Sequence, residues 1–291
     1  MKIIIFGAGM AAPHCAQYAR YLGHEILCFV DNDPNKQGKT IALESAGGGG
    51  GRNVYEIKPP SALLEMSFDR VMLSLYFASW CEKVCQQLTN DFAIPAHKID
   101  TSFVTFRHAS RYIFLTKVAK MLRNLQGNVA ELGVFRGEFA RHINAHFPTK
   151  KLYLFDTFEG FTESDLQHEN RHVQNMGVGH LGDTHVELVL SQMPHVAQCV
   201  VRKGWFPDTA RGLESERFCF VSLDTDLHDS TLAGLEFFYP RLVSGGVILI
   251  DDYDNGFDGV SRAVDAFCAR EKIACMPIGD IFSVALQKGA R

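Results

Sequence analysis

The stretch "NVAELGVFRGEFARHI", residues 128 to 143, decides the fold of the larger part of this chain. Its apolar run reaches Glu131 and then enters a turn framed by Gly133 and Gly137, after which a helical pattern begins. A strand, a glycine turn and a helix in this order are typical of nucleotide-binding α/β folds, because glycine lets backbone approach a bound group closely. The stretch therefore predicts a first strand that ends beside a ligand.

The next apolar run, "KLYLFDTFEGF", places Asp156 at the carboxyl end of a second strand. The ligand crevice of an open α/β sheet lies at this edge, where carboxylates can accept hydrogen bonds from an amine or a ribose. The combination predicts an S-adenosylmethionine site, with Glu131 at the methionine amine and Asp156 at the ribose. Gly133 and Gly137 would form the turn around the donor; the alternative is that they only pack the turn.

The alternation of strand and helix patterns continues to the end of the chain. The two short apolar runs "IACMPI" and "IFSVALQ" are separated by Gly279-Asp280, which predicts a terminal hairpin. We therefore expect an α/β protein in which a Rossmann-like domain, residues 1–104, precedes a seven-stranded class I methyltransferase doubly wound sheet, residues 105–291. The last strand of that sheet should run antiparallel.

The first half of the chain repeats the same pattern. An apolar strand runs into Gly7 and Gly9, and a second strand, "EILCFV", ends at Asp31, where a dinucleotide fold carries its ribose-binding acid. A nucleotide at these three residues is one interpretation, and a purely structural turn is the other. The low-complexity loop at 44–53 stands where the sheet would continue, and no tyrosine has a lysine four residues later, so hydride transfer lacks a visible catalyst.

Composition excludes several classes of protein. The chain has 291 residues and a formal net charge of -4, with no basic run that would follow a nucleic-acid backbone. No apolar span is long enough for a membrane helix, and the eight cysteines form no CxxC pair. We expect a cytoplasmic protein with a sugar-containing small-molecule substrate and no nucleic-acid or membrane partner. Assembly into a homo-oligomer stays open.

Carboxylates gather after two neighbouring strands. Asp224 follows "FCFVSL", and the adjacent pair Asp251-Asp252 follows "VILI", with Asp226 as a close fourth. Neighbouring anions at the end of buried strands repel each other, so a metal ion, a cationic partner or water must compensate. Oxygen-only ligation suits Mg²⁺, and we predict a metal site at Asp224, Asp251 and Asp252. Helix capping, the alternative, explains the adjacent pair poorly.

Several motifs in order resemble the macrocin O-methyltransferase family over residues 108 to 290. They are "ELGVFRGE", "FDTFEGF", "KGWFPDT", "LDTDLHDST", "FYPRLVSGG" and "IDDYD". The resemblance implies S-adenosylmethionine, a divalent cation held by Asp224, Asp251 and Asp252, and a sugar hydroxyl as methyl acceptor. The family often shows tyrosine at the position of His228 and Leu-Pro where this chain has Phe161-Thr162, which leaves the acceptor open.

The remaining candidates concern proton transfer and substrate access. Asp224 or His228 would take the proton of the acceptor hydroxyl, while His228 could instead pack beside the metal. The polar segment that contains His168, His172, His180 and His185 reads as a solvated lid more than as a zinc site. Two other functions stay open: a nucleotide-binding sensor without turnover, and a nicotinamide-dependent oxidoreductase of nucleotide sugars.

Overall fold

The protein consists of two compact units, Met1–Ala109 and Ser110–Arg291. The computed structural model describes residues 1–44, 52–75, 78–167, 169–254 and 258–289. The division falls inside helix α3 (Ser102–Leu122), whereas the sequence predicted a boundary after residue 104. In the described ranges, no helix combines the length and apolar character that crossing a bilayer requires.

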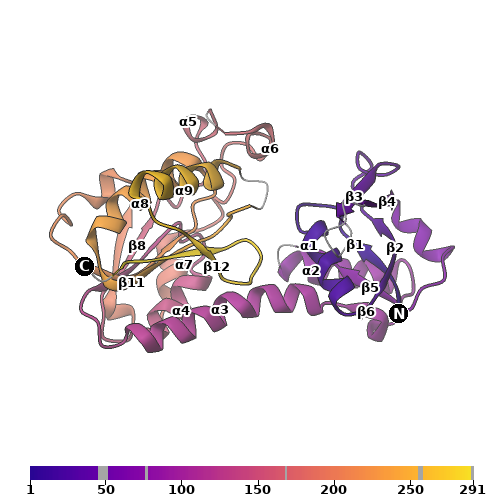
Figure 1. Cartoon of the computed structure of the whole chain (residues 1–291), viewed down its shortest axis with the longest axis horizontal. Helices are drawn as coiled ribbons and strands as arrows, with labels where there is room; N and C mark the ends of the chain where they lie inside the picture. Colours follow the sequence, from indigo (N-terminus) through magenta and orange to yellow (C-terminus); the bar gives the residue numbers. More distant parts are fainter. Residues whose placement is uncertain (45–51, 76–77, 168, 255–257, 290–291) are drawn as a thin grey trace. The chain divides into compact units, whose positions relative to one another are not determined.

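The first unit is a six-stranded sheet with the order β3-β4-β2-β1-β5-β6 (Figure 1). All neighbours pair in parallel except β3 and β4, which are antiparallel. The strands are β1 (Lys2–Phe6), β2 (Glu25–Val30), β3 (Thr40–Glu44), β4 (Arg52–Lys58), β5 (Arg70–Leu73) and β6 (Ile99–Asp100). The helices are α1 (Ala12–Tyr21) and α2 (Ala78–Asn90), with 3₁₀ turns η1 (Pro60–Leu64) and η2 (Ala96–Lys98).

This arrangement has the strand order of a Rossmann-type half, as the sequence predicted. The residues Ile3, Ile4 and Ile5 of β1 are fully buried, which is typical of a central parallel strand covered on both faces. The loop predicted at 44–53 is wrong at its ends, because Glu44 belongs to β3 and Arg52 and Asn53 belong to β4, which continues the sheet beside β2. Residues 45–51 lie outside the described part of the chain.

The second unit contains a seven-stranded sheet with the order β12-β13-β11-β10-β7-β8-β9. Strand β13 pairs antiparallel with β11 and with β12, so the predicted terminal hairpin and antiparallel last strand are confirmed. The strands are β7 (Asn128–Leu132), β8 (Leu152–Asp156), β9 (Cys199–Lys203), β10 (Phe218–Leu223), β11 (Leu242–Ile250), β12 (Met276–Pro277) and β13 (Val284–Gln287).

Helices cover this sheet, as the ribbon in Figure 1 shows for α8 and α9. The helices of the second unit that follow α3 are α4 (Glu138–His146), α5 (Glu163–Leu166), α6 (Arg171–Gln174), α7 (Val186–Ser191), α8 (His228–Arg241) and α9 (Asp258–Glu271), with 3₁₀ turns η3 (Val196–Gln198) and η4 (Asp208–Ala210). Of these, α5 and α6 project beyond α9 (Figure 1). The later part of α3 joins the core through Leu115, Val118 and Leu122. This packing fixes the axis of α3 beside the sheet, which matters because α3 also carries Arg111.

Candidate active site

The turn after β7 requires glycine for reasons of packing. Gly133 has φ +83°, and a Cβ atom there would lie 1.7 Å from the carbonyl oxygen of Asp224. Gly137 has φ +81° at the start of α4, and a Cβ atom would lie 2.9 Å from Cγ1 of Val189. The packing alternative therefore accounts for both glycines, and their contact with a methyl donor stays a prediction.

Asp156 organises the same turn. Its Oδ2 accepts hydrogen bonds from the amides of Val134, at 2.7 Å, and Phe135, at 2.8 Å, while Oδ1 accepts from Phe158 at 2.7 Å. These contacts tie the carboxyl end of β8 to the turn that follows β7. Each carboxylate oxygen can accept more than one hydrogen bond, so the predicted ribose contact is compatible with this geometry but is not tested by it.

Glu131 is only partly explained by protein contacts, because a hydrogen bond with the backbone of Ala140 leaves one carboxylate oxygen over. It is 1% exposed at the end of β7, and its Oε2 has no hydrogen-bond partner among the described residues. Burial raises the pKa of Glu131 well above its usual range, and Asp224 raises it further, although Arg111 acts in the opposite direction. A buried carboxyl group in this state is stabilised by a proton or by a cationic ligand.

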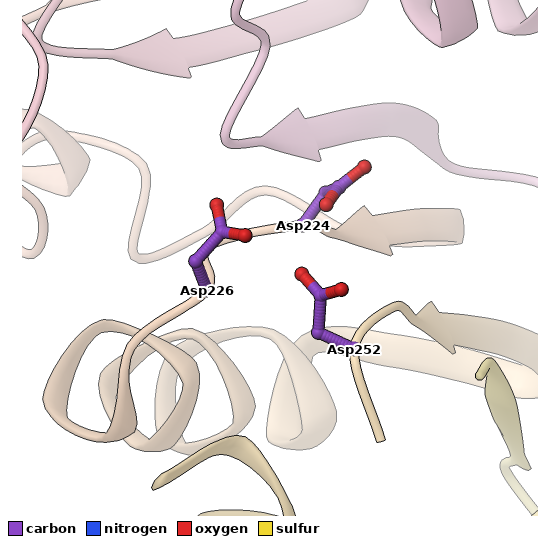
Figure 2. Close-up of side chains that lie close together, drawn as sticks. All are labelled: Asp224, Asp226 and Asp252. Atoms are coloured by element: carbon purple, nitrogen blue, oxygen red, sulfur yellow. The ribbon is translucent and has the colours of Figure 1, made fainter. Parts of the chain in front are cut away.

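Three carboxylates converge at the carboxyl ends of β10 and β11. Figure 2 shows Asp224 and Asp226, from the loop after β10, facing Asp252 from the loop after β11. One oxygen from each residue can be chosen so that the three lie within 4.8 Å of one another. Asp226 and Asp252 have φ of +59° and +63°, a conformation that non-glycine residues adopt rarely and that often marks functional sites.

The charges in this cluster are incompletely compensated. Burial raises the pKa of Asp224 and of Asp226, and the neighbouring carboxylates raise both further. The side chain of Asp252 acts in the opposite direction on the pKa of Asp226 but does not outweigh burial. Three hard oxygen ligands at this separation fit a divalent cation such as Mg²⁺.

Asp251 does not join the three carboxylates as the sequence predicted. Its Oδ2 pairs with Nη1 of Arg111, whose Nη2 lies 3.0 Å from Oδ2 of Asp224. The structure therefore groups Asp226 with Asp224 and Asp252, in place of Asp251. The two adjacent aspartates tolerate each other because they face different partners, a guanidinium for Asp251 and the carboxylate cluster for Asp252.

A buried hydroxyl supports Asp251 from its other side. Oγ of Ser283 lies 2.7 Å from Oδ1 of Asp251 and 2.6 Å from Oδ2 of Asp280. A hydroxyl has only one proton to donate, so one of these two carboxyl groups must donate in return. Burial and the charge of Asp251 raise the pKa of Asp280, which makes Asp280 the better candidate for the protonated partner.

His228 begins α8, two residues after Asp226. Its Nδ1 lies 2.7 Å from Oδ1 of Asp229, a contact that orients the ring. Of the predicted histidine segment, His180 packs against Phe161 and His185 caps α7, where its Nδ1 accepts from the amide of Leu188.

His168 lies outside the described residues, and nothing is described of the His172 side chain. Among the residues that are described, histidine contributes to no group suited to a metal.

Sequence reasoning missed Arg111. It is the cation in "SRYIFLT", an otherwise apolar part of α3, and its guanidinium also lies 4.2 Å from the ring centroid of Phe139. Burial lowers the pKa of Arg111, but Asp251 and Asp224 outweigh burial and keep the group charged. The available signal was an arginine that is followed directly by the aromatic and aliphatic run Tyr112, Ile113 and Phe114.

The predicted nucleotide residues of the first unit also have protein partners. Asp31 accepts from the amides of Ala8, at 2.7 Å, and Asp33, at 2.8 Å, and it pairs with Lys36. A Cβ atom on Gly7 would lie 2.5 Å from the carbonyl oxygen of Ser74, so glycine is required there without a ligand. Gly9 is different, because a Cβ atom there would meet nothing within 4 Å.

The strand order and the antiparallel last strand of the second unit define a class I methyltransferase. Residues 113–287 match the family described as macrocin-O-methyltransferase (TylF). This match covers more than half of the chain, which therefore belongs to that family.

Two curated relatives are similar to part of the chain. An 8-demethyl-8-(2,3-dimethoxy-alpha-L-rhamnosyl)-tetracenomycin-C 4'-O-methyltransferase of Streptomyces olivaceus is 32% identical over 166 residues, which is 53% of this chain and 62% of that protein. A mycinamicin III 3''-O-methyltransferase of Micromonospora griseorubida is 32% identical over 144 residues, 44% of this chain and 55% of that protein. The chain thus matches somewhat more than half the length of these relatives.

Solved structures agree on the fold. The O-methyltransferase NovP has a TM-score of 0.51 and 23% identity, covering 62% of this chain and 80% of its own. The calicheamicin methyltransferase CalS11 has a TM-score of 0.54 and 18% identity, covering 74% of this chain and 95% of its own. The predicted α/β methyltransferase fold is confirmed.

Proposed function

We propose that this protein transfers a methyl group from S-adenosylmethionine to a hydroxyl of a sugar, within a glycoside, a nucleotide sugar or a polysaccharide precursor. Membership of the macrocin-O-methyltransferase family supports methyl transfer. The rhamnosyl group in the name of the Streptomyces olivaceus relative supports a sugar acceptor. The observation that carries the proposal is the convergence of Asp224, Asp226 and Asp252 at the edge of the sheet where ligands of this fold bind.

Glu131 supports the identity of the methyl donor. Its buried carboxyl group carries an oxygen without a partner among the described residues, and S-adenosylmethionine carries both an ammonium and a sulfonium cation. Binding such a cation would stabilise the charged form of Glu131 and remove the penalty of burying it. Gly133, Gly137 and Asp156 would shape the turn against which the donor lies.

Asp224, Asp226 and Asp252 would hold the divalent cation. When bound, the cation supplies positive charge that favours deprotonation of a weakly acidic sugar hydroxyl and helps to align it. Arg111 would keep Asp224 oriented, because its guanidinium holds one oxygen of that carboxylate and leaves the other available. A sugar with two neighbouring hydroxyls is the expected acceptor, since two oxygens would fix its position.

Asp224 and His228 remain the candidates for taking the proton. The carboxyl of Asp224 has a raised pKa because of burial, which makes it a stronger base than an exposed aspartate. His228 is oriented by Asp229 and lies at the same edge of the sheet. His228→Gln separates them, because Asp224→Asn would also replace a ligand of the cation. A fall in kcat of about 10²-fold or more in His228→Gln assigns the proton transfer to His228, and a nearly unchanged kcat assigns it to Asp224.

The activity is tested by incubating the full chain with methyl-labelled S-adenosylmethionine, Mg²⁺ and a panel of rhamnosides and nucleotide-linked deoxysugars. We expect the label on a sugar oxygen, with turnover abolished by chelation and restored by added Mg²⁺. Mass spectrometry of the acceptor identifies the methylated atom. Methylation at full rate after exhaustive chelation would contradict the role of the metal, and transfer to nitrogen or carbon would contradict the acceptor class.

A nucleotide in the first unit stays a prediction with one supporting observation. Gly9 has no packing reason to be glycine, whereas Gly7 and Asp31 do. Calorimetric titration with reduced nicotinamide dinucleotide and with a uridine nucleotide would detect such a ligand. Saturable binding that Gly9→Val removes would support it.

A further inference from the structure

A polar contact joins the segment after β8 to the first turns of α8 and α9. The segment 161–180 contains α5 and α6, which project from the second unit beyond α9 (Figure 1). Its neck is closed by backbone hydrogen bonds, from Phe161 to the carbonyl of His180 at 3.0 Å and from Gly179 to the carbonyl of Phe161 at 2.8 Å. These two hydrogen bonds join the ends of the segment to each other and do not connect α5 and α6 to α8 or α9.

Glu169 provides this attachment. It is 6% exposed, and its Oε1 accepts a hydrogen bond of 2.7 Å from the amide of His228, the first residue of α8. Its Oε2 would lie 2.3 Å from a Cβ atom built on Gly259, the second residue of α9. The carboxylate is therefore held between the first turns of two 14-residue helices, whose dipoles favour negative charge there, while burial has the larger effect and raises the pKa of Glu169.

The neighbouring residues reinforce this position. Nδ2 of Asn170 donates to Oδ1 of Asp258, so two consecutive residues contact the beginnings of both helices. Oδ1 of Asn170 accepts from the amide of Val173 at 3.1 Å, and Nε2 of Gln174 donates to the carbonyl of Glu169 at 2.9 Å. Hydrogen bonds to the first turn of α6 therefore hold Glu169 and Asn170 in position for their contacts with α8 and α9.

The contact lies beside the carboxylate cluster. His228 follows Asp226 by two residues, so its amide lies within about 7 Å of chain length from the cluster. We propose that Glu169 is a positioning residue, which holds the segment 161–180 against α8 and α9 so that the segment forms a wall for the methyl acceptor. This inference rests on the proposed methyl-transfer function.

Two substitutions disturb this contact from opposite sides. Glu169→Ala removes the carboxylate, and Gly259→Ala inserts a methyl group into the space that Oε2 occupies. Alanine forms helix better than glycine, so a loss caused by Gly259→Ala must come from the collision with Glu169. In the double variant this collision is absent, and the second substitution should add no further loss. Glu163→Ala, an exposed acid in α5, is the matched control.

Hydrogen exchange of the full chain measures the attachment without requiring turnover. We expect amide exchange at Gln174 and Met176 to accelerate about tenfold in both single variants, to be no faster in the double variant, and to stay unchanged in Glu163→Ala. Glu169→Gln retains the acceptor for the His228 amide and should restore much of the protection. Exchange in Glu169→Ala equal to that of the control would overturn the proposal.

Steady-state kinetics with an acceptor that the enzyme methylates test whether the segment 161–180 contacts that acceptor. We expect KM for the acceptor to rise about tenfold in Glu169→Ala while kcat changes less than about threefold, because Glu169 contacts the backbone amide of His228 and not the carboxylates of the cluster. Affinity for S-adenosylhomocysteine should stay constant. An unchanged KM for the acceptor would overturn the proposed contact between the segment and the acceptor, even if amide hydrogen exchange accelerates. Absence of turnover with every acceptor would contradict the proposed function instead, and the exchange experiment would still decide whether Glu169 holds the segment.

Discussion

The two units of this protein share a backbone frame and differ in the side chains placed on it. In the first unit the amide of Gly7 donates to the carbonyl of Val30 at 2.8 Å, and in the second the amide of Gly133 donates to Phe155 at 2.9 Å. Both glycines have positive φ, and at both a Cβ atom would collide with the backbone that follows a neighbouring strand, at Ser74 and at Asp224. The same geometry therefore arises twice from unrelated side chains.

The acid after the second strand belongs to this shared frame. Asp31 accepts from the amide of Ala8, and Asp156 accepts from the amide of Val134, both at 2.7 Å. A glycine turn and a strand-terminal aspartate, which look like a ligand signature in sequence, are explained in both units by the hydrogen bonds that hold the turn. They show where a ligand of this fold binds but not that one is bound.

The difference lies at two equivalent positions. Two residues before the glycine stands Ile5 in the first unit and Glu131 in the second, both almost completely buried. After the neighbouring strand stands Ser74 in the first unit and Asp224 in the second. Burying a carboxylate costs several kcal/mol that isoleucine and serine do not incur. The second unit thus carries unfavourable charge where the first does not, and this difference locates the chemistry.

The largest effect is expected at Asp252, the most buried residue of the carboxylate cluster in the second unit. Asp252→Asn should lower turnover by about 10³-fold, because one ligand of the cation is replaced by a neutral amide. Donor affinity should change less than about threefold, since Glu131 lies on another strand. Steady-state kinetics and calorimetry measure the two quantities. Asp254→Asn, an exposed neighbour, serves as control, and equal losses in both variants would refute the role of Asp252.

Arg111 is expected to have the next largest effect, on stability. Arg111→Met leaves the partly buried carboxylates of Asp251 and Asp224, 11% and 28% exposed, without their counter-ion, which should destabilise the second unit by about 2–4 kcal/mol. Adding Asp224→Ser, which introduces the residue type found at the equivalent position of the first unit, should recover part of the lost stability. Arg211→Met, which breaks an exposed ion pair with Asp208, should change stability by less than about 1 kcal/mol.

Urea unfolding measures these differences. If Arg111→Met is no more destabilising than Arg211→Met, the buried ion pairs are not what stabilises the adjacent aspartates.

Glu131→Ile makes the second unit resemble the first at the buried position. We expect affinity for S-adenosylhomocysteine to fall about 100-fold, because the ammonium loses its carboxylate, while stability is retained or increased. Calorimetry measures affinity, and thermal unfolding measures stability. Gly133→Val is a poor test of the same site, since its side chain would collide with the backbone of Asp224. Unchanged affinity in Glu131→Ile would remove the main support for the donor site.

The sequence predicted the strands and turns better than it predicted which residues pair with each acidic side chain. Apolar runs and glycine spacing mark strands and turns locally, so the two α/β halves, the glycine turn and the terminal hairpin could be predicted. The replacement of Asp251 by Asp226 in the cluster could not, because it depends on Arg111, which lies 140 residues away in the chain. Strand ends show where carboxylates gather, but only tertiary packing determines which of them meets a cation.

The smallest expected effect is the dependence of stability on pH, which differs between the units. Burial raises the pKa of Asp224 and Asp226 from 3.8 to about 7, so between about pH 4 and 7 the folded state binds more protons than the unfolded state. This contribution to stability is complete below the unfolded pKa and is lost as pH rises through the folded pKa. Without metal, the thermal midpoint of the second unit should therefore fall by about 2–8 °C from pH 5 to pH 8.

Saturating Mg²⁺ should reverse part of this fall, because the cation competes with protons for the same oxygens. Calorimetric scans at several pH values, with Mg²⁺ and with chelator, measure the effect. Asp226→Asn is the informative variant, since it removes one of the two titrating groups and should flatten the chelated profile. A midpoint in chelator that rises through this pH range, or a profile that Mg²⁺ leaves unchanged, would mean that the clustered carboxylates are compensated by the protein itself, as Asp31 is by Lys36 in the first unit.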